Sequence, residues 1–380
     1  MTFFTSKRNK LMTSLAATAM LVTIVTPASA NSMSTLQTAK VKVNNYYKLS
    51  IQTVSDVQTS AKIKIATLNY LNKSLTTKKY ANEKAYLMKR VEAKSHAIYK
   101  YYKNNLLETK GQEMSNILSS TNWQGTRVYD KNHQDLTKEN VNFIGLAKYE
   151  AKSGRYEFFD AKTGNSRGDT GTFFISNDGK KRIHISESLK YQAVVEMIKL
   201  NKDVFTYKRM GKDTNGNDVE VFVEHVPFKE KNLSFTNPDK QLDTTTGNII
   251  RNIDGDIILG NTLWTGTKVL DENGNDLTMY NTNFISLAKF DNKSNKYEFF
   301  NAATGKSRGD YGYFDVGHEN KIRAHVSIGD NKYGAVLEIT ELNKKKFTYK
   351  RTGKDKDGKD ITIFVEHEPY KGQYKPNFSF

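Results

Sequence analysis

The sequence predicts a mainly β protein with an N-terminal α-helical segment, in which two eight-stranded antiparallel barrels follow one another. Three observations support this fold class. A stretch of about 110 residues occurs twice, each copy alternates short apolar runs with turn signals, and the residues before the first copy follow a helical period. A pair of β-sandwiches is the alternative, because sequential hairpins build either architecture.

The first thirty residues have the pattern of a secretory signal peptide. A short basic region precedes a largely apolar stretch at residues 11–25, and Ala28-Ser29-Ala30 provides the small residues that a signal peptidase cleaves after. The basic residues are Lys7, Arg8 and Lys10. The apolar stretch is too short and too rich in Thr and Ser for a membrane anchor. We therefore expect cleavage of residues 1–30 and a secreted, extracellular protein without a transmembrane segment, at most loosely associated with a cell surface.

Residues 31–117 form a basic segment that predicts helices. They contain fifteen Lys and Arg against five Asp and Glu, in a chain of net charge +17. Apolar side chains recur at helical spacing on both sides of a break at Ser74 to Lys79. The recurring residues are Leu36, Val43, Tyr47, Val54, Val57, Ile65, Leu68 and Leu71, then Tyr80, Leu87, Val91, Ile98, Tyr102 and Leu106. We expect two long helices, whose lysines either bind an anionic cell-envelope polymer or are simply solvated.

The duplication defines the domain boundaries. Several motifs of the first copy return 141 or 142 positions later in the second copy. The paired motifs begin at Trp123 and Trp264, Asn142 and Asn283, Tyr156 and Tyr297, Ser166 and Ser307, Phe205 and Phe347, and Val223 and Val365. The copies span residues 118–228 and 259–370. Residues 229–258 are expected to form a linker, and residues 371–380 a C-terminal tail.

Each copy is predicted to consist of about eight short strands joined by tight turns. Asn215-Gly216 is a strong hairpin signal, because a type I′ turn needs positive φ at both central residues. The last predicted strand alternates cleanly, with Val219, Val221, Val223 and His225 on one face. Such strands favour an up-and-down barrel, whose interior is either filled by side chains or holds one small ligand.

The repeated motifs also carry a family resemblance. The set Trp-x-Gly-Thr-x-Val, Asn-Phe-Ile-x-Leu-Ala-Lys, Ser-Arg-Gly-Asp-x-Gly and Phe-Thr-Tyr-Lys-Arg resembles secreted, tandem lipocalin-like domains of unknown function from Gram-positive bacteria. The resemblance covers residues 118–228 and 259–370. It implies a lipocalin-like barrel in each copy, and it brings no activity and no catalytic residue.

Two Arg-Gly-Asp triplets are the candidate binding residues of the sequence. They are predicted to lie in equivalent loops after the Tyr-Glu-Phe-Phe strands. An exposed triplet binds integrins through its carboxylate and guanidinium, whereas a local turn with glycine at positive φ is the alternative. The residues are Arg167, Gly168 and Asp169 in the first copy and Arg308, Gly309 and Asp310 in the second.

The histidines and the Asp-rich turns are expected to be structural. His184 lies in Arg182-x-His184-x-Ser186, on one strand face, and the neighbouring arginine opposes a metal cation. The Asp-rich turn that begins at Asp213 lacks the glycine and glutamate of a calcium-binding EF-hand loop. We therefore expect no metal and no cofactor.

The sequence favours a secreted, non-enzymatic binding protein. It contains no nucleophile motif and no phosphate-binding glycine loop. The basic helices would hold an anionic surface, and the barrels would bind a protein partner or a small apolar ligand. The alternatives are a host-directed adhesin that uses the Arg-Gly-Asp loops to bind a host surface protein, and an enzyme with an unrecognised site.

Overall fold

The computed structural model describes residues 34–51, 54–105, 108–242, 247–250 and 254–380, so the predicted signal peptide, residues 1–30, lies outside the described part. The chain divides into a helical unit that ends at Tyr99 and a unit from Lys100 onward that contains all the described strands. None of the described helices is long and apolar enough to cross a membrane.

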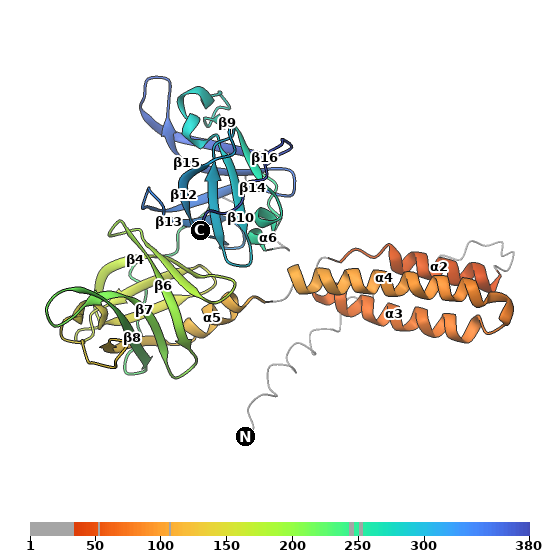
Figure 1. Ribbon diagram of the computed structural model, residues 1–380, viewed down its shortest axis with the longest axis horizontal. Helices are drawn as coiled ribbons and strands as arrows, with labels where there is room; N and C mark the ends of the chain where they lie inside the picture. The colour runs from red at the N-terminus through yellow and green to blue at the C-terminus, as the bar shows by residue number, and fades with distance from the viewer. Residues whose placement is uncertain (1–33, 52–53, 106–107, 243–246, 251–253) are drawn as a thin grey trace. The chain divides into compact units, whose positions relative to one another are not determined.

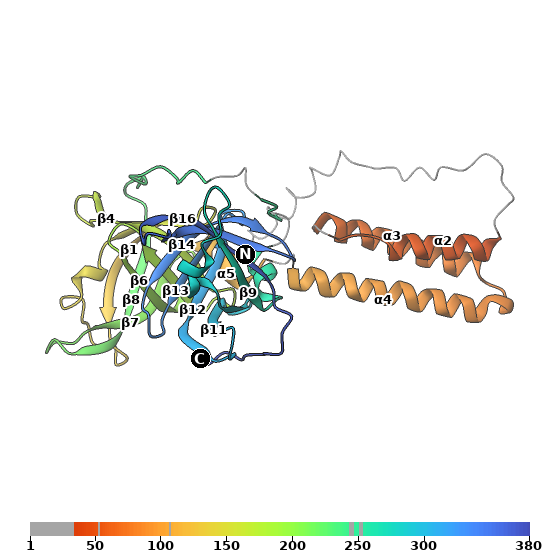
Figure 2. The same cartoon turned by 90° about the horizontal axis from the view of Figure 1, so that it is seen from above.

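Three helices lie side by side in the helical unit (Figures 1 and 2). They are α2 (Thr35–Tyr47), α3 (Val54–Ser74) and α4 (Ala81–Asn105), and the short 3₁₀ helix η1 (Lys78–Tyr80) precedes α4. Apolar side chains at helical spacing meet between the helices and form a core of their own. Its buried members are Ala39, Val43, Tyr46, Leu71, Leu75, Leu87, Val91 and Ile98.

The described residues of this unit form three helices, where the sequence predicted two. The first predicted helix is interrupted between Tyr47 and Val54. Asparagine favours non-helical backbone, because its side chain competes for backbone hydrogen bonds, and Asn44 and Asn45 directly precede the end of α2. Among the described residues, the apolar period also misassigned Tyr47, which is exposed while Tyr46 is buried, and Ile65, which is exposed.

Each sequence copy folds into a closed eight-stranded antiparallel barrel, in which consecutive strands pair and the last strand pairs with the first. This confirms the predicted fold and excludes the sandwich alternative. Barrel 1 contains β1 (Asn122–Tyr129), β2 (Leu146–Glu150), β3 (Arg155–Phe159), β4 (Ser166–Ile175), β5 (Lys181–Ser186), β6 (Tyr191–Leu200), β7 (Phe205–Lys212) and β8 (Asp218–Phe228). Barrel 2 contains β9 (Trp264–Leu270), β10 (Leu287–Asp291), β11 (Lys296–Phe300), β12 (Ser307–Gly317), β13 (Ile322–Ser327), β14 (Gly334–Leu342), β15 (Phe347–Lys354) and β16 (Asp360–Pro369).

A short helix packs against each barrel just before its first strand. Helix α5 (Lys110–Leu118) lies against the β4–β5 turn of barrel 1, where the Gly111 amide donates to the Asn177 carbonyl. Helix α6 (Gly255–Gly260) contacts β10 and β12 of barrel 2. The indole of Trp123 donates to the last carbonyl of α5, at Leu118, over 2.7 Å. Both partners are fully buried, so helix and barrel share one core.

The predicted linker and C-terminal tail are partly integrated into the barrels. After β8, the chain returns over the outer face of β3, where the backbone and hydroxyl groups of Thr236 donate to the buried carboxylate of Glu157. After β16, Ser379 makes the same two hydrogen bonds to the buried Glu298. A buried carboxylate needs such donors, so these segments belong to the domains that they follow. The polar composition of the segments concealed this role.

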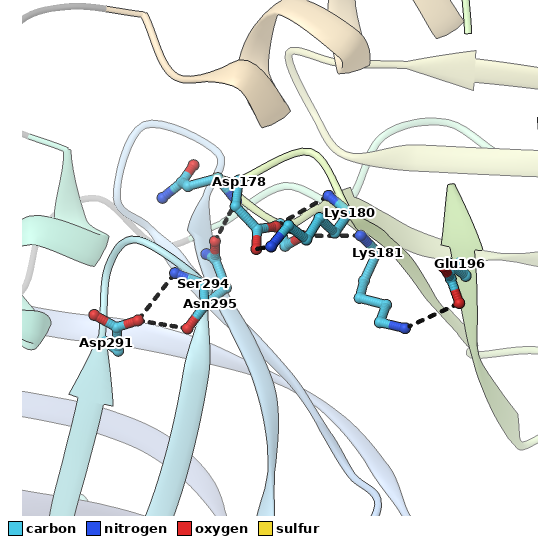
Figure 3. Close-up of polar contacts among 9 residues, drawn as sticks. Asp178, Lys180, Lys181, Glu196, Asp291, Ser294 and Asn295 are labelled. Atoms are coloured by element: carbon cyan, nitrogen blue, oxygen red, sulfur yellow. Dashed lines mark hydrogen bonds and ion pairs between the residues drawn. The ribbon is translucent and has the colours of Figure 1, made fainter. Parts of the chain in front are cut away.

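The two barrels contact one another through a mixed apolar and polar interface. Phe174, Ile183 and Ile185 on the outside of barrel 1 pack with Ala324 and Val326 of barrel 2. Figure 3 shows the adjacent turns, in which Asn295 of barrel 2 faces the β4–β5 turn of barrel 1 around Asp178 and Lys180. The Asn295 side chain accepts the backbone N–H of Asn177 over 2.6 Å.

Three aspartates gather beside these turns. Asp256 is fully buried and accepts hydrogen bonds from the side chains of Asn177 and Asn295. Asp254 accepts from Gln112 of α5, and Asp315 lies half-buried on β12. Burial and the neighbouring carboxylates raise the pKa of Asp256, and burial with the Asp254 charge raises the pKa of Asp315 to about 7.

Candidate functional site

Barrel 1 encloses a cavity of about 380 Å³ at the end opposite α5. The connections of an up-and-down barrel alternate between its two ends. The cavity residues Asn142, Arg167 and Leu189 belong to the β1–β2, β3–β4 and β5–β6 regions, which share one end. The apolar core and α5 fill the other end, so the barrel is closed at one end and open at the other.

Arg182 is the most unusual residue of the cavity. It lies on β5 and is only 2% exposed, and no carboxylate among the described residues lies within ion-pair distance of it. Its Nη1 donates to the phenol oxygen of Tyr149, and its Nε is buried without a hydrogen-bond partner. The guanidinium also faces the ring of Tyr207 at 4.6 Å. A guanidinium cannot lose its proton at physiological pH, so barrel 1 buries a positive charge without a negative partner.

Among the described residues, Asp169 is the only acidic residue of the cavity lining, and three hydroxyl groups donate hydrogen bonds to it. The hydroxyls of Tyr156 and Ser186 donate to its Oδ1 over 2.9 and 2.8 Å, and the hydroxyl of Tyr191 donates to its Oδ2. Burial is the largest effect on both tyrosines, and it raises the pKa of Tyr156 and of Tyr191. Both phenols therefore stay protonated and act as donors.

The two histidines of the cavity lining are neutral. Burial, reinforced by the nearby Arg182, lowers the pKa of His225 to about 3 and places the pKa of His184 well below its usual value. The Nδ1 atoms of both rings are buried without a partner. Within the described residues, no group of three His, Asp or Glu side chains is arranged to hold a metal ion. The cavity thus carries the charges of Arg167, Arg182 and Arg209 against one aspartate.

The Arg-Gly-Asp triplets lie at bulges within β4 and β12, where the sequence predicted loops. In β4, Phe158 pairs with Asp169 while Phe159 pairs with Ser166, so Arg167 and Gly168 are extra residues. Gly168 has a φ of +73°, which favours glycine. A bulge changes the direction of the side chains that follow it. It turns Asp169 into the barrel, while the exposed Arg167 donates to the carbonyl of Asn142.

The triplet of barrel 2 has the same arrangement. Asp310 accepts hydrogen bonds from the hydroxyls of Tyr297 and Tyr333, each over 2.9 Å. Arg308 donates to the carbonyl of Asn283, and Gly309 has a φ of +71°. Integrin binding requires an exposed carboxylate that can contact the receptor. The carboxylates of Asp169 and Asp310 instead accept hydrogen bonds from hydroxyl groups of the barrel interior.

Barrel 2 also repeats the unpaired arginine. Arg323 is 2% exposed, and it faces the ring of Tyr349 at 4.6 Å. Its Nε, like that of Arg182, is buried without a partner. The position of Tyr149 is occupied by Phe290, so the phenol oxygen that accepts from Arg182 has no counterpart beside Arg323.

Comparison with known proteins matches residues 115–235 and 256–378 to a family described as a domain of unknown function, DUF4822. The chain belongs to this family. The two DUF4822 matches cover both barrels, and each extends into the segment that folds back over the buried glutamate. No curated protein matches the chain.

The sequence analysis placed Arg182 on the same strand face as His184, but it did not identify Arg182 as a candidate binding residue. The alternation on β5 placed Arg182, His184 and Ser186 on one face, and that face is the barrel interior. The sequence pattern indicates only that this arginine opposes a metal ion. A sequence cannot show whether an acidic residue pairs with Arg182. Asp169 points into the same interior from the preceding strand, β4, but it accepts hydrogen bonds from hydroxyl groups instead.

Proposed function

We propose that this DUF4822 chain is a secreted, non-enzymatic binding protein whose barrels hold a small molecule. The observation that carries the proposal is the cavity of about 380 Å³ in barrel 1, which is open at one end and closed by α5 at the other. Ligand pockets typically have volumes of about 300–1,000 Å³. The lining combines aromatic rings with arginines, which fits an amphipathic ligand better than the purely apolar one expected from the sequence.

The lining supports binding rather than catalysis. The hydroxyls of Tyr156, Ser186 and Tyr191 are directed to Asp169, and no hydrogen bond joins them to His184 or His225 among the described residues. A nucleophilic site needs a hydroxyl in hydrogen-bond contact with a base that is itself oriented. The cavity instead holds its polar groups in fixed positions, as a binding site does.

Filling the cavity tests this proposal. Ala147 of β2 lines the cavity, whereas its neighbour Lys148 points to the outside of the barrel, because successive strand residues alternate. The probe is anilinonaphthalene sulfonate, whose fluorescence rises in apolar sites. We expect saturable binding to the wild type, loss of one binding equivalent in Ala147→Phe, and unchanged binding in the control Lys148→Phe. Equal binding in all three proteins, or no saturable binding, would contradict the proposal.

The helical unit suggests how such a protein stays near a surface. Tyr86 and Tyr99 are more than half exposed on α4, and exposed lysines lie on the same helix. Arg90 and Lys94 face the exposed ring of Tyr47, at 4.8 and 5.8 Å. Basic side chains interleaved with exposed aromatic rings suit an anionic polymer. We propose that residues 31–117 hold the secreted protein on an anionic cell-envelope polymer.

A further inference from the structure

We infer that barrel 1 binds its ligand as an anion, and that the buried guanidinium group of Arg182 holds the ligand's carboxylate or other oxyanion. This inference rests on the proposed function of the cavity and adds the chemical class of the ligand. It starts from the charge balance inside barrel 1. Three arginines line the cavity, and the single aspartate is saturated by three hydroxyl donors.

A buried charge without a partner is costly, because it loses its hydration and gains no compensating charge. Arg182 obtains one hydrogen bond from the protein, to the neutral phenol of Tyr149, and otherwise faces aromatic rings. Aromatic faces attract a cation but offer no lone pair in the plane of the guanidinium. An oxyanion in the cavity would supply both the charge and the acceptors that the protein leaves out.

The second barrel supports the same conclusion from a different environment. Its arginine is equally buried, has no acidic partner among the described residues, and cannot donate to a phenol at the position of Tyr149, since Phe290 stands there. The unpaired arginine is therefore common to both barrels, although the residue at the position of Tyr149 differs. Its immediate aromatic neighbours, Phe205 and Tyr207 in barrel 1 and Phe347 and Tyr349 in barrel 2, are the same.

The rest of the lining indicates the body of the ligand. Phe143, Phe158 and Leu189 surround the entrance of the cavity, and Arg209 lies over the Phe143 ring at 4.1 Å. A ligand with its anionic group at Arg182 would place its remaining atoms among these apolar side chains. The class is thus a small carboxylate or comparable oxyanion with a planar or otherwise apolar body.

Two probe pairs of equal shape test the inference on the full-length mature chain. 2-Naphthoate and benzoate each carry a carboxylate, whereas 2-naphthamide and benzamide are neutral. By isothermal titration calorimetry, we expect each carboxylate to bind the wild type at least tenfold more tightly than its amide. The double variant Arg182→Met/Arg323→Met should bind carboxylate and amide with equal affinity, and Arg182→Lys/Arg323→Lys should keep part of the preference because the charge remains.

The outcomes separate the two proposals. Equal affinity of the wild type for carboxylate and amide overturns the inference but leaves the small-molecule cavity in place. A preference that survives the double methionine variant also overturns it, since another group would then hold the anion. If neither carboxylates nor amides bind, the cavity accepts no ligand of this size, and the proposed function fails together with the inference. The wild-type comparison needs no variant, so a misfolded variant does not affect it.

Discussion

The guanidinium of Arg182 donates a hydrogen bond to the phenol oxygen of Tyr149 in barrel 1, whereas Arg323 in barrel 2 faces the ring of Phe290. Burial raises the pKa of Tyr149 to about 12, so its hydroxyl keeps its proton. Since the oxygen accepts from the arginine, the hydroxyl proton remains available to a ligand. Barrel 1 therefore has a phenol hydroxyl next to its buried arginine, and barrel 2 has a phenylalanine ring at the same position.

This difference makes the Tyr149 hydroxyl a direct test of the site in barrel 1. Tyr149→Phe should weaken the binding of 2-naphthoate to barrel 1 about three- to tenfold, which corresponds to the loss of one hydrogen bond worth about 0.5–1.5 kcal/mol. Phe290→Tyr, at the equivalent position of barrel 2, is the matched control and should leave the affinity of barrel 1 unchanged. Calorimetric titration of each variant measures both effects. Unchanged affinity in both variants would mean that the phenol does not contact the ligand.

The pH dependence of binding distinguishes arginine from histidine as the anion receptor. The pKa of His225 lies at about 3 and that of His184 well below its usual value, because both rings are buried beside Arg182. Both histidines stay neutral in the physiological range, and the arginine stays charged. The affinity for 2-naphthoate should therefore be constant between about pH 5.5 and 8. A rise in affinity of tenfold or more on acidification would indicate a protonated histidine in the site.

Substitution of Asp169 should destabilise the protein more than substitution of Arg167 in the same triplet. Asp169→Ala leaves the hydroxyls of Tyr156, Ser186 and Tyr191 without their shared acceptor, and we expect a loss of about 2–4 kcal/mol in the free energy of unfolding. Arg167→Ala removes an exposed side chain, and it should cost less than about 1 kcal/mol. Urea denaturation of both variants measures the two effects.

The integrin hypothesis makes the opposite prediction for the same residues. It expects adhesion of integrin-bearing cells to depend on Arg167 and Asp169 alike, and to be lost in Asp169→Glu/Asp310→Glu. We expect adhesion, if present, to be the same in Arg167→Ala and in the wild type. Loss of adhesion in the folded Arg167→Ala variant would restore the adhesin interpretation.

The sequence predicted the barrels well because their signals are local. Asn215-Gly216 and the alternation from Val219 to His225 each depend on neighbouring residues, and they fall where the structure has a turn and β8. The turn is not of type I′, because only Gly216 of the pair has a positive φ. The helical unit was predicted less well. The burial of Tyr46 in place of Tyr47 depends on how three helices pack, which a single period cannot show.

The candidate site depends on residues far apart in the chain, so the sequence predicted little of it. Asp169 was recognised as part of a motif, and its burial follows from a bulge that brings it opposite Phe158. The partners of Arg182 come from β2 and β7, and its lack of a carboxylate is a property of the whole interior. Tertiary geometry of this kind leaves no local pattern.

The basic helical segment, residues 31–117, should determine binding to anionic polymers. Lys89 and Lys100 are exposed on α4, and reversing their charge should lower the salt concentration at which the full-length protein leaves a heparin column. Lys344→Glu/Lys356→Glu is the matched control, because it changes the net charge equally at exposed turns of barrel 2. An equal shift in both double variants would mean that total charge, rather than the helices, governs retention.

The aspartates between the barrels predict a pH-dependent stability. The pKa of Asp315 is raised to about 7 in the folded protein, from a usual value near 4. A carboxyl group with a raised folded pKa favours folding while it is protonated, and this contribution is lost as the pH rises from about 4 to about 7. The wild type should therefore lose stability over this range relative to Asp315→Asn, whose amide remains neutral.

The difference in melting temperature between Asp315→Asn and the wild type isolates this effect from the buried histidines, which act in the opposite direction and are present in both proteins. We expect the difference to be near zero at pH 4.5 and to favour the variant increasingly up to about pH 8. Asp360→Asn is the control, because Asp360 is exposed on β16 and pairs with Lys354 at the surface. A constant difference across the range would show that Asp315 is ionised in the folded protein throughout, and that the contact between the barrels tolerates its charge.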